Sequence, residues 1–334
     1  MPVLAGRMPG VMSLTSSART DDTGSEGFEH YGVFLDSPSD LRDLVVPRVR
    51  DALSDGDHVT VAVREPHEEA IRAALGDRGA DLDITARAEF YDAPGRTLAR
   101  LHRLALTHPT RRITVVAEPV LPMDAPVGLR EWHRLDSVLG SVLAGCRMRL
   151  LCLHDSRLLP AGTRELARRT HPVLVTSDGE RNSPDHQDPA TFSAVDVARP
   201  LPSPTGTVHT LEIRPDLPAL RDEVTTLATT AGIPEERVGD LVLAVNELAA
   251  NVLEHGAGKG TISLWRSAGW IVCDVFDEGG TLTDPLIGYR PTDPHGTRGY
   301  GLWITRQLCD FMEISGGGHG SLIRMHFPPV PESH

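Results

Sequence analysis

The residues Leu241-Val-Leu-Ala-Val-Asn-Glu-Leu-Ala-Ala-Asn-Val-Leu-Glu-His-Gly256 decide the fold of the C-terminal third of this chain. Their larger apolar side chains recur at spacings of four, three and four residues, at Leu241, Val245, Leu248 and Val252. This period predicts an amphipathic helix. Glu247 and Asn251 stand four residues apart, so a carboxylate and an amide lie side by side on one helix face. The pair has two interpretations: ordinary surface polarity, or a proton acceptor beside a ligand for a hard cation, which suits phosphate chemistry.

Two further motifs follow this helix. Strands are expected at residues 260–266 and 270–276, and the second leads directly into Asp277-Glu-Gly-Gly280. After a loop rich in Pro, Asp and Gly, the run Gly296-Thr-Arg-Gly-Tyr-Gly-Leu302 opens another helix. Glu-x3-Asn, Asp-x-Gly and Gly-x-x-Gly-x-Gly-Leu follow one another over about 55 residues. This order resembles the ATP-binding domain of the GHKL superfamily, and most closely the bacterial anti-sigma-factor serine/threonine kinases.

The resemblance implies ATP and Mg²⁺ as cofactors and assigns roles to the motif residues. Glu247 would be the general base, Asn251 would hold Mg²⁺, and Asp277 would accept a hydrogen bond from the adenine amino group. Thr281 stands where the family has the last glycine of the second motif, so Gly280 would supply the space for the base one place early. The other nucleotide-binding residues would be Gly279, Gly280, Gly296, Arg298, Gly299, Tyr300, Gly301 and Leu302. Residues 281–295 would form a lid over the nucleotide.

By the same resemblance, the protein would phosphorylate an anti-sigma-factor antagonist of the STAS type and sequester a sigma factor; a homodimer is a further expectation. Two alternatives stay open. A histidine kinase needs a phosphoacceptor histidine on a dimerising helix, whereas His209 is expected in a strand and His67 lacks the following proline. A nucleotide-sensing module without phosphotransfer is the other alternative, because the glycine motif after Asp277 is altered.

Composition limits the remaining classes. A length of 334 residues predicts two domains, and 40% hydrophobic residues can build their cores. The net charge of −13 disfavours a nucleic-acid binder and binding to acidic membrane surfaces. The sequence has no apolar run long enough for a signal peptide or a membrane span. The four cysteines form no C-x-x-C pair, which favours a reducing cytoplasm.

Strands and helices alternate between residues 30 and 175, which predicts an α/β layered domain with a mainly parallel sheet. His30-Tyr31, Leu150-Leu-Cys-Leu-His-Asp155 and Arg169-Thr-His-Pro172 resemble the MEDS sensory domain. The family usually has Cys-x-Tyr-Asp where this chain has Cys152-Leu-His-Asp155, and a Glu where Asp136 stands.

The N-terminal domain could bind a small-molecule signal. His30, Cys152, His154 and His171 are expected to gather at the carboxyl ends of strands, where open α/β sheets bind ligands. A metal or haem site and a set of loop histidines beside a core thiol are both compatible with these residues.

The predicted organisation has five parts. They are a disordered tail at 1–27, the MEDS-like sensory domain at 28–180, a linker at 181–207, the GHKL domain at 208–328 and a tail at 329–334. The GHKL domain is expected to be an α/β sandwich with helices on one face of a mixed sheet. The linker is predicted because Pro, Ser and Asp dominate it without any periodicity.

Overall fold

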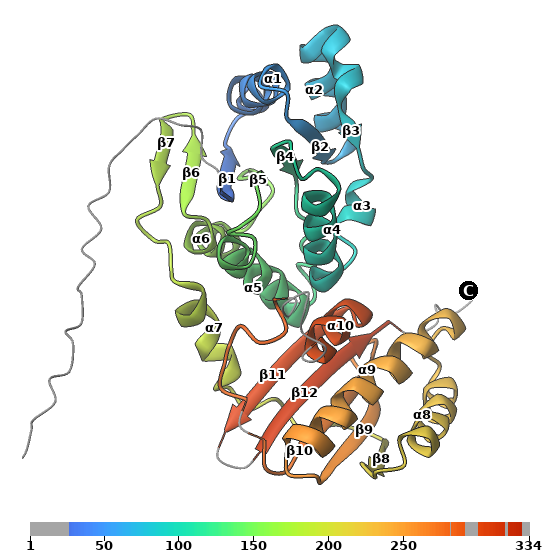
Figure 1. The fold of residues 1–334 in the computed structure, drawn as a ribbon. Coiled ribbons are helices and arrows are strands. Elements are labelled where there is room, and N and C mark those ends of the chain that lie inside the picture. Colours follow the sequence, from blue (N-terminus) through green and yellow to red (C-terminus); the bar gives the residue numbers. More distant parts are fainter. Residues whose placement is uncertain (1–26, 281, 291–299, 318–319, 329–334) are drawn as a thin grey trace, which may run out of the picture.

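The computed structural model describes residues 27–280, 282–290, 300–317 and 320–328. The chain forms two α/β domains, each with its own sheet (Figure 1). Among the described residues, no helix combines the length and the apolar character needed to cross a bilayer.

The first domain is built on a seven-stranded sheet in the order β3-β2-β4-β5-β1-β6-β7. Its strands are β1 Glu29–Leu35, β2 His58–Ala62, β3 Asp83–Ile84, β4 Ile113–Ala117, β5 Met148–Asp155, β6 Val173–Thr176 and β7 Gly179–Asn182. All neighbours are parallel except β7, which runs antiparallel to β6. The mainly parallel sheet is therefore confirmed. A short edge strand, β7, follows residue 175, where the predicted alternation of strands and helices ended. Its central strands are buried along nearly their whole length, as strands covered on both faces must be.

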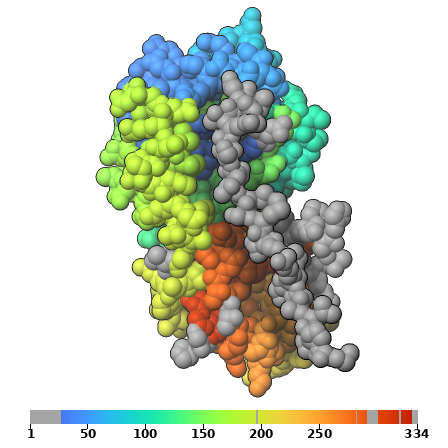
Figure 2. Space-filling model, turned by 60° about the vertical axis from the view of Figure 1, so that its left-hand side comes forward, coloured from blue at the N-terminus to red at the C-terminus, as the bar shows by residue number. Residues whose placement is uncertain are grey.

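Helices connect these strands. They are a π-turn Leu41–Val45 that continues into α1 Val46–Ser54, α2 Glu65–Leu75, a 3₁₀ segment Gly76–Asp81, α3 Arg87–Phe90, α4 Pro94–Thr107, α5 Pro126–Val142, α6 Ala161–Thr170 and α7 Pro189–Val197. The helix α7 lies inside the predicted linker and packs against α5 and against β11 of the second domain. In Figure 2 the lime-coloured segment that includes β6, β7 and α7 runs from the first domain onto the second.

The second domain is a five-stranded sheet in the order β11-β12-β10-β9-β8, with helices on one face. Its elements are β8 Val208–Glu212, α8 Leu217–Ala231, α9 Glu235–His255, β9 Gly260–Ser267, β10 Trp270–Asp277, α10 Gly301–Leu308, β11 Phe311–Gly317 and β12 Gly320–Phe327. The α/β sandwich was predicted correctly, but the prediction of a mixed sheet was wrong. Every pairing between the described strands is antiparallel, because β9–β10 and β11–β12 are hairpins and β12 returns alongside β10.

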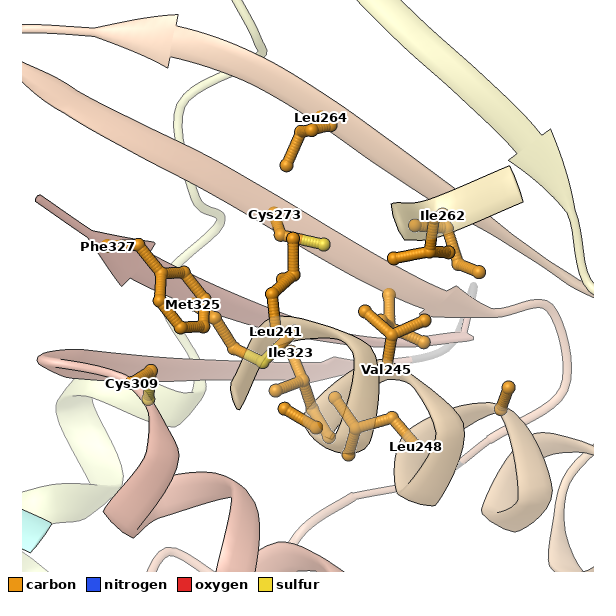
Figure 3. Packing of buried hydrophobic residues seen from close by; sticks show 14 of the residues in the cluster. Leu241, Val245, Leu248, Ile262, Leu264, Cys273, Cys309, Ile323, Met325 and Phe327 are labelled. Atoms are coloured by element: carbon orange, nitrogen blue, oxygen red, sulfur yellow. The ribbon is translucent and has the colours of Figure 1, made fainter. Parts of the chain in front are cut away.

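The apolar stripe of α9 forms the core of this domain. Leu241, Val245 and Leu248 point from the helix to the sheet (Figure 3). They meet apolar side chains of β9, β10 and β12, among them Ile262, Cys273, Ile323, Met325 and Phe327. Each fully buried aliphatic side chain contributes about 1.5–3 kcal/mol. This packing fixes the rotation of α9 and turns Glu247 and Asn251, which are only partly buried, away from the sheet core.

Two glycines of the first domain allow the domains to approach closely. A Cβ on Gly95 in α4 would lie 1.9 Å from the carbonyl oxygen of Arg306 in α10. A Cβ on Gly128 in α5 would lie 2.7 Å from the ring of Phe311 in β11. The far face of the second sheet therefore packs partly on helices of the first domain, where Phe311 joins the same apolar cluster as Trp132.

Candidate nucleotide site and a buried polar cluster

A cavity of about 670 Å³ opens beside α9. This volume is in the range of sites for small molecules and cofactors. Its walls are α9, the adjoining ends of β10 and β12, the segment 282–290 and the first turn of α10. The apolar part of its lining includes Leu248, Val252, Val275, Leu282, Ile287 and Ile323.

The first turn of α10 comes unusually close to α9. A Cβ on Gly301 would lie 3.2 Å from Asn251 Nδ2 and 3.2 Å from Glu247 Oε2. Glu247, Asn251 and Gly301 therefore meet at one point, with Asn251 and Gly301 lining the cavity. The Glu247 carboxylate and the oxygen of the Asn251 amide, whose nitrogen faces Gly301, are hard donors of the kind that Mg²⁺ takes together with phosphate oxygens. These two residue types therefore fit that ion.

Asp277 lies where β10 ends, at the cavity wall. Its Oδ1 accepts hydrogen bonds from the backbone N–H groups of Ala257 and Gly279, at 3.0 and 3.1 Å. A Cβ on Gly280 would lie 2.6 Å from Asp277 Oδ2 and 2.9 Å from Ser321 Oγ. Gly280 thus leaves room beside the second carboxylate oxygen.

The N-terminus of α10 offers backbone donors to the cavity. The first backbone hydrogen bond of this helix runs from Ile304 N–H to Tyr300 O, at 2.8 Å. The N–H groups of Gly301 and Leu302 precede it and have no partner within the helix, and both residues line the cavity. Such a helix end attracts anions through its free donors and its positive dipole end.

The structure brings some of the predicted site residues together at the cavity, and others lie at its edge or outside the described residues. Glu247, Asn251, Asp277, Gly280, Gly301 and Leu302 gather at or beside the cavity. Gly279 lies against Ala257 at its edge, and Tyr300 is the N-cap of α10. Gly296, Arg298 and Gly299 lie outside the described residues, so their placement stays a prediction.

Several lining residues were not predicted. The Ser321 hydroxyl accepts a hydrogen bond from Leu282 N–H at 2.8 Å, fixing the start of the segment 282–290. His255, in the last turn of α9, also lines the cavity. The end of α9 is closed by backbone bonds from Gly256 N–H to Asn251 O and from Gly258 N–H to Val252 O. A lone serine in a strand carries no sequence signal for such a position.

The segment 282–290 connects the cavity to the first domain. Tyr289 is fully buried, and the guanidinium carbon of Arg306 lies 3.7 Å from the centre of its ring. Arg306 donates to the carbonyl of Ile287 at 3.4 Å, and Arg134 of α5 donates to that of Pro285 at 3.2 Å. The buried Glu131 carboxylate pairs with both arginines, at 3.5 and 3.2 Å. The wall of the cavity is therefore held by a helix of the other domain.

A second set of polar side chains gathers in the first domain. Ligand atoms of His30, Asp136, Cys152 and His171 all lie within 4.8 Å of one another, and all four side chains are buried. Three of them were predicted to come together; His154 lies beside the set, with its ring centre 5.0 Å from that of His171. Burial lowers the pKa of His171 to about 4 and raises the pKa of Asp136 to about 7.

The place of this set differs from the expectation. His30 is the second residue of β1 and Cys152 lies within β5, so the set is on the face of the sheet and not at the carboxyl ends of the strands. The carboxyl ends carry an ion-pair network instead. Arg64 contacts both Glu118 and Asp155 there, and His67 Nδ1 lies 3.0 Å from Glu118. These paired side chains occupy much of the carboxyl-end edge of the sheet, and the cavity that they line there has a volume of only about 120 Å³.

Comparison with known proteins agrees with the two domains. Residues 211–327 match the family described as histidine kinase-like ATPase domain, and residues 29–172 match MEDS, the methanogen/methylotroph DcmR sensory domain. No curated protein matches the chain significantly.

A solved structure of the RsbU and RsbW domains of a protein from Mycobacterium tuberculosis is similar to part of the chain, with 15% identity and a TM-score of 0.28. The similarity covers 37% of this chain and 33% of that chain, so this chain spans about a third of that length. By its family matches, the chain joins a MEDS sensory domain to a histidine kinase-like, ATP-binding domain.

Proposed function

We propose that this protein is an ATP-dependent serine/threonine protein kinase that acts as an anti-sigma factor, and that its MEDS domain controls the kinase domain. The substrate would be a small antagonist of the STAS type, and a sigma factor would be the sequestered partner. The observation that supports the proposal best is the convergence of Asn251, Asp277 and Gly301 on one cavity, with the Glu247 carboxylate beside Gly301.

Each of these residues has a task in phosphoryl transfer. One carboxylate oxygen of Asp277 accepts hydrogen bonds from two backbone N–H groups. This orients the other carboxylate oxygen to accept a hydrogen bond from the adenine amino group. The free N–H groups of α10 bind phosphate oxygens. Asn251 would hold Mg²⁺, which neutralises the phosphates and aligns them when bound. Glu247 accepts the proton of the attacking serine or threonine hydroxyl.

The segment 282–290 gives the sensory domain a route to this site. It lines the cavity through Leu282 and Ile287, and its carbonyls are bound by Arg134 of α5 and by Arg306. A shift of α5 would therefore move a wall of the nucleotide site directly.

A histidine kinase is less well supported. His67 is buried at 8% exposure, and both of its ring nitrogens are engaged, by Glu118 and by Arg64. A phosphoacceptor must be accessible to the γ-phosphate, whereas this imidazole is buried and engaged on both sides. His209 is exposed, but it lies in strand β8 and not on a helix.

The test is phosphotransfer by full-length protein from labelled ATP to proteins captured with it in the presence of ATP or ADP. Glu247→Gln should lower transfer by at least about 10²-fold, the low end of general-base contributions, and leave ATP affinity within a few-fold. Glu254→Gln is the matched control, because Glu254 is on the same helix but exposed, with only a 3.9 Å pair to His255.

Three results would contradict the proposal. One is transfer by the Glu247→Gln protein at the rate of the unmodified protein. Another is an acid-labile phosphate, which would indicate a phosphohistidine. The third is ATP binding without turnover in the presence of every captured protein, which would indicate a nucleotide-sensing module.

A further inference from the structure

The buried set of His30, Asp136, Cys152 and His171, here called the His–Cys–Asp cluster, combines four potential metal ligands from four separate segments. They come from β1, α5, β5 and the residue after α6. Exposure of the four side chains ranges from 0% for His171 to 5% for Asp136. Polar groups this deeply buried are normally paired with hydrogen-bonding partners.

The sheet places two of the ligands and makes room for a third. His30 pairs with Leu150 and Gly32 pairs with Cys152, so side chains of residues 30 and 152 emerge on the same sheet face. Gly32 lies between them without a side chain. A Cβ there would lie 3.1 Å from both Cβ and Cγ of His171. The glycine thus lets the imidazole of His171 lie against the strand.

His171 is oriented as a ligand. Its Nδ1 lies 2.7 Å from the Ala167 carbonyl oxygen, so this nitrogen carries the proton and donates it. Nε2 then holds a lone pair, and it is buried with no hydrogen-bond partner. A ring N–H bonded to a backbone carbonyl while the other nitrogen faces the metal is the usual arrangement around histidine ligands.

Outside the cluster, the described hydrogen-bond partners of its four side chains are the Ala167 carbonyl and the Thr170 hydroxyl, both at His171 Nδ1. Cys152 Sγ lies 3.4 Å from His30 Nε2, and none of the described hydrogen bonds or ion pairs involves the Asp136 carboxyl. Both ring nitrogens of the adjacent His133 and His154 are also buried and unpartnered. The concentration of unsatisfied donors and acceptors at one point calls for a ligand in contact with them.

We propose that the His–Cys–Asp cluster binds one divalent transition-metal ion, with zinc the ion that it fits best. Two imidazole nitrogens, a thiolate and a carboxylate form a four-ligand set typical of tetrahedral Zn²⁺, whereas Mg²⁺ and Ca²⁺ take oxygen ligands. The thiolate and the carboxylate balance the charge of the ion, so no net charge is buried. In a tetrahedron with bonds of about 2.0–2.3 Å the ligands are about 3.3–3.8 Å apart. The widest separation here, within 4.8 Å, closes with small side-chain rotations.

The test is metal binding by full-length protein after treatment with a chelator, with Co²⁺ as the spectroscopic probe and Zn²⁺ as its competitor. We expect one Co²⁺ per chain, a thiolate-to-cobalt charge-transfer absorption in the near ultraviolet, and its loss on adding Zn²⁺. Zn²⁺ should also raise the melting temperature of the first domain, because it binds only the folded state.

Variants assign the site. Cys152→Ser should abolish the charge-transfer absorption, and Asp136→Asn should weaken Co²⁺ binding by at least about ten-fold. Cys146→Ser is the matched control, since Cys146 is in the same domain, partly buried and outside the cluster. ATP binding by each variant reports whether the second domain is intact. Unmodified protein that binds less than one equivalent of either metal would overturn the proposal. So would a folded Cys152→Ser protein that keeps the original absorption and affinity.

Discussion

At Gly301 we expect a single methyl group to disturb the candidate nucleotide site. The space at its missing side chain lies 3.2 Å from polar atoms of both Glu247 and Asn251. A methyl group there must push α10 away from α9 or displace the two polar side chains. Either change disturbs the end of the cavity that α9 and α10 line.

We therefore expect Gly301→Ala to weaken ATP binding by at least about ten-fold, which corresponds to about 1.4 kcal/mol. Isothermal titration of full-length protein measures it. Gly239→Ala is the control, because Gly239 lies on α9 with no atom within 4 Å of the space for a side chain. It should stabilise the helix by about 0.5–1 kcal/mol and leave ATP affinity unchanged. Equal ATP affinity in both variants would show that the close approach at Gly301 does not matter.

At this scale the sequence was informative where residue type and spacing together carry the chemistry. Glu247 and Asn251 share a helix face by their spacing, and Asp277 follows a buried strand. Ser321 could not be predicted, because its role depends on the segment 282–290 folding back to β12. Asp136 was placed only by family likeness, since no periodicity indicates that α5 turns it towards Cys152.

Among the elements, the segment 282–290 depends most on its surroundings. It has no helix or strand of its own, and its position rests on Tyr289 and on carbonyls held by Arg134 and Arg306. The Tyr289 ring lies 3.7 Å from the guanidinium carbon of Arg306, close enough for a cation–π interaction.

Tyr289→Ala should release this segment, because truncating a buried aromatic side chain costs about 3–5 kcal/mol. We expect faster amide hydrogen exchange at residues 285–290 and lower ATP affinity. Tyr289→Phe keeps the ring over Arg306 and should behave almost as the unmodified protein. Unchanged exchange in the alanine variant would mean that other contacts position the cavity wall.

Periodicity predicted the elements that bury an apolar face against one layer. The helix α9 and the strands β9 and β10 followed from such patterns. The helix α6 escaped prediction because its sequence Ala-Gly-Thr-Arg-Glu-Leu-Ala-Arg-Arg-Thr has few large apolar residues. The helix α7 lies in a segment whose composition predicted a linker. Contacts with α5 and β11 hold this helix in place.

At the scale of the whole molecule, the contact between the two domains depends on a glycine and on charged residues that no sequence motif singles out. Gly95 in α4 lies against the Arg306 carbonyl, and Arg96 pairs with Asp310 at 2.8 Å. Asp310 also pairs with Arg237 of α9 at 2.9 Å. One carboxylate thus joins helices of both domains. Sequence alone could not indicate this, because ion pairs between residues far apart along the chain leave no periodic pattern.

Gly95→Ala should open this contact, because the new methyl carbon would lie 1.9 Å from a backbone oxygen that has no freedom to rotate away. Small-angle scattering should show a larger radius of gyration, and hydrogen exchange should rise in α4 and α10. Gly140→Ala is the control, since Gly140 lies in α5 with no atom near the space for its side chain. Equal scattering by both variants would contradict the contact.

The central claim is that a magnesium-bound adenine nucleotide occupies the cavity between α9, the end of β10 and the start of α10. The most direct measurement is calorimetric titration of ATP and Mg²⁺ into full-length protein and into its Asp277→Ala variant. We predict one ATP per chain and an affinity that falls by about ten- to a hundred-fold in the variant, as expected for a lost hydrogen bond to a charged group. No heat at millimolar ATP, or equal affinity in both proteins, would contradict the account.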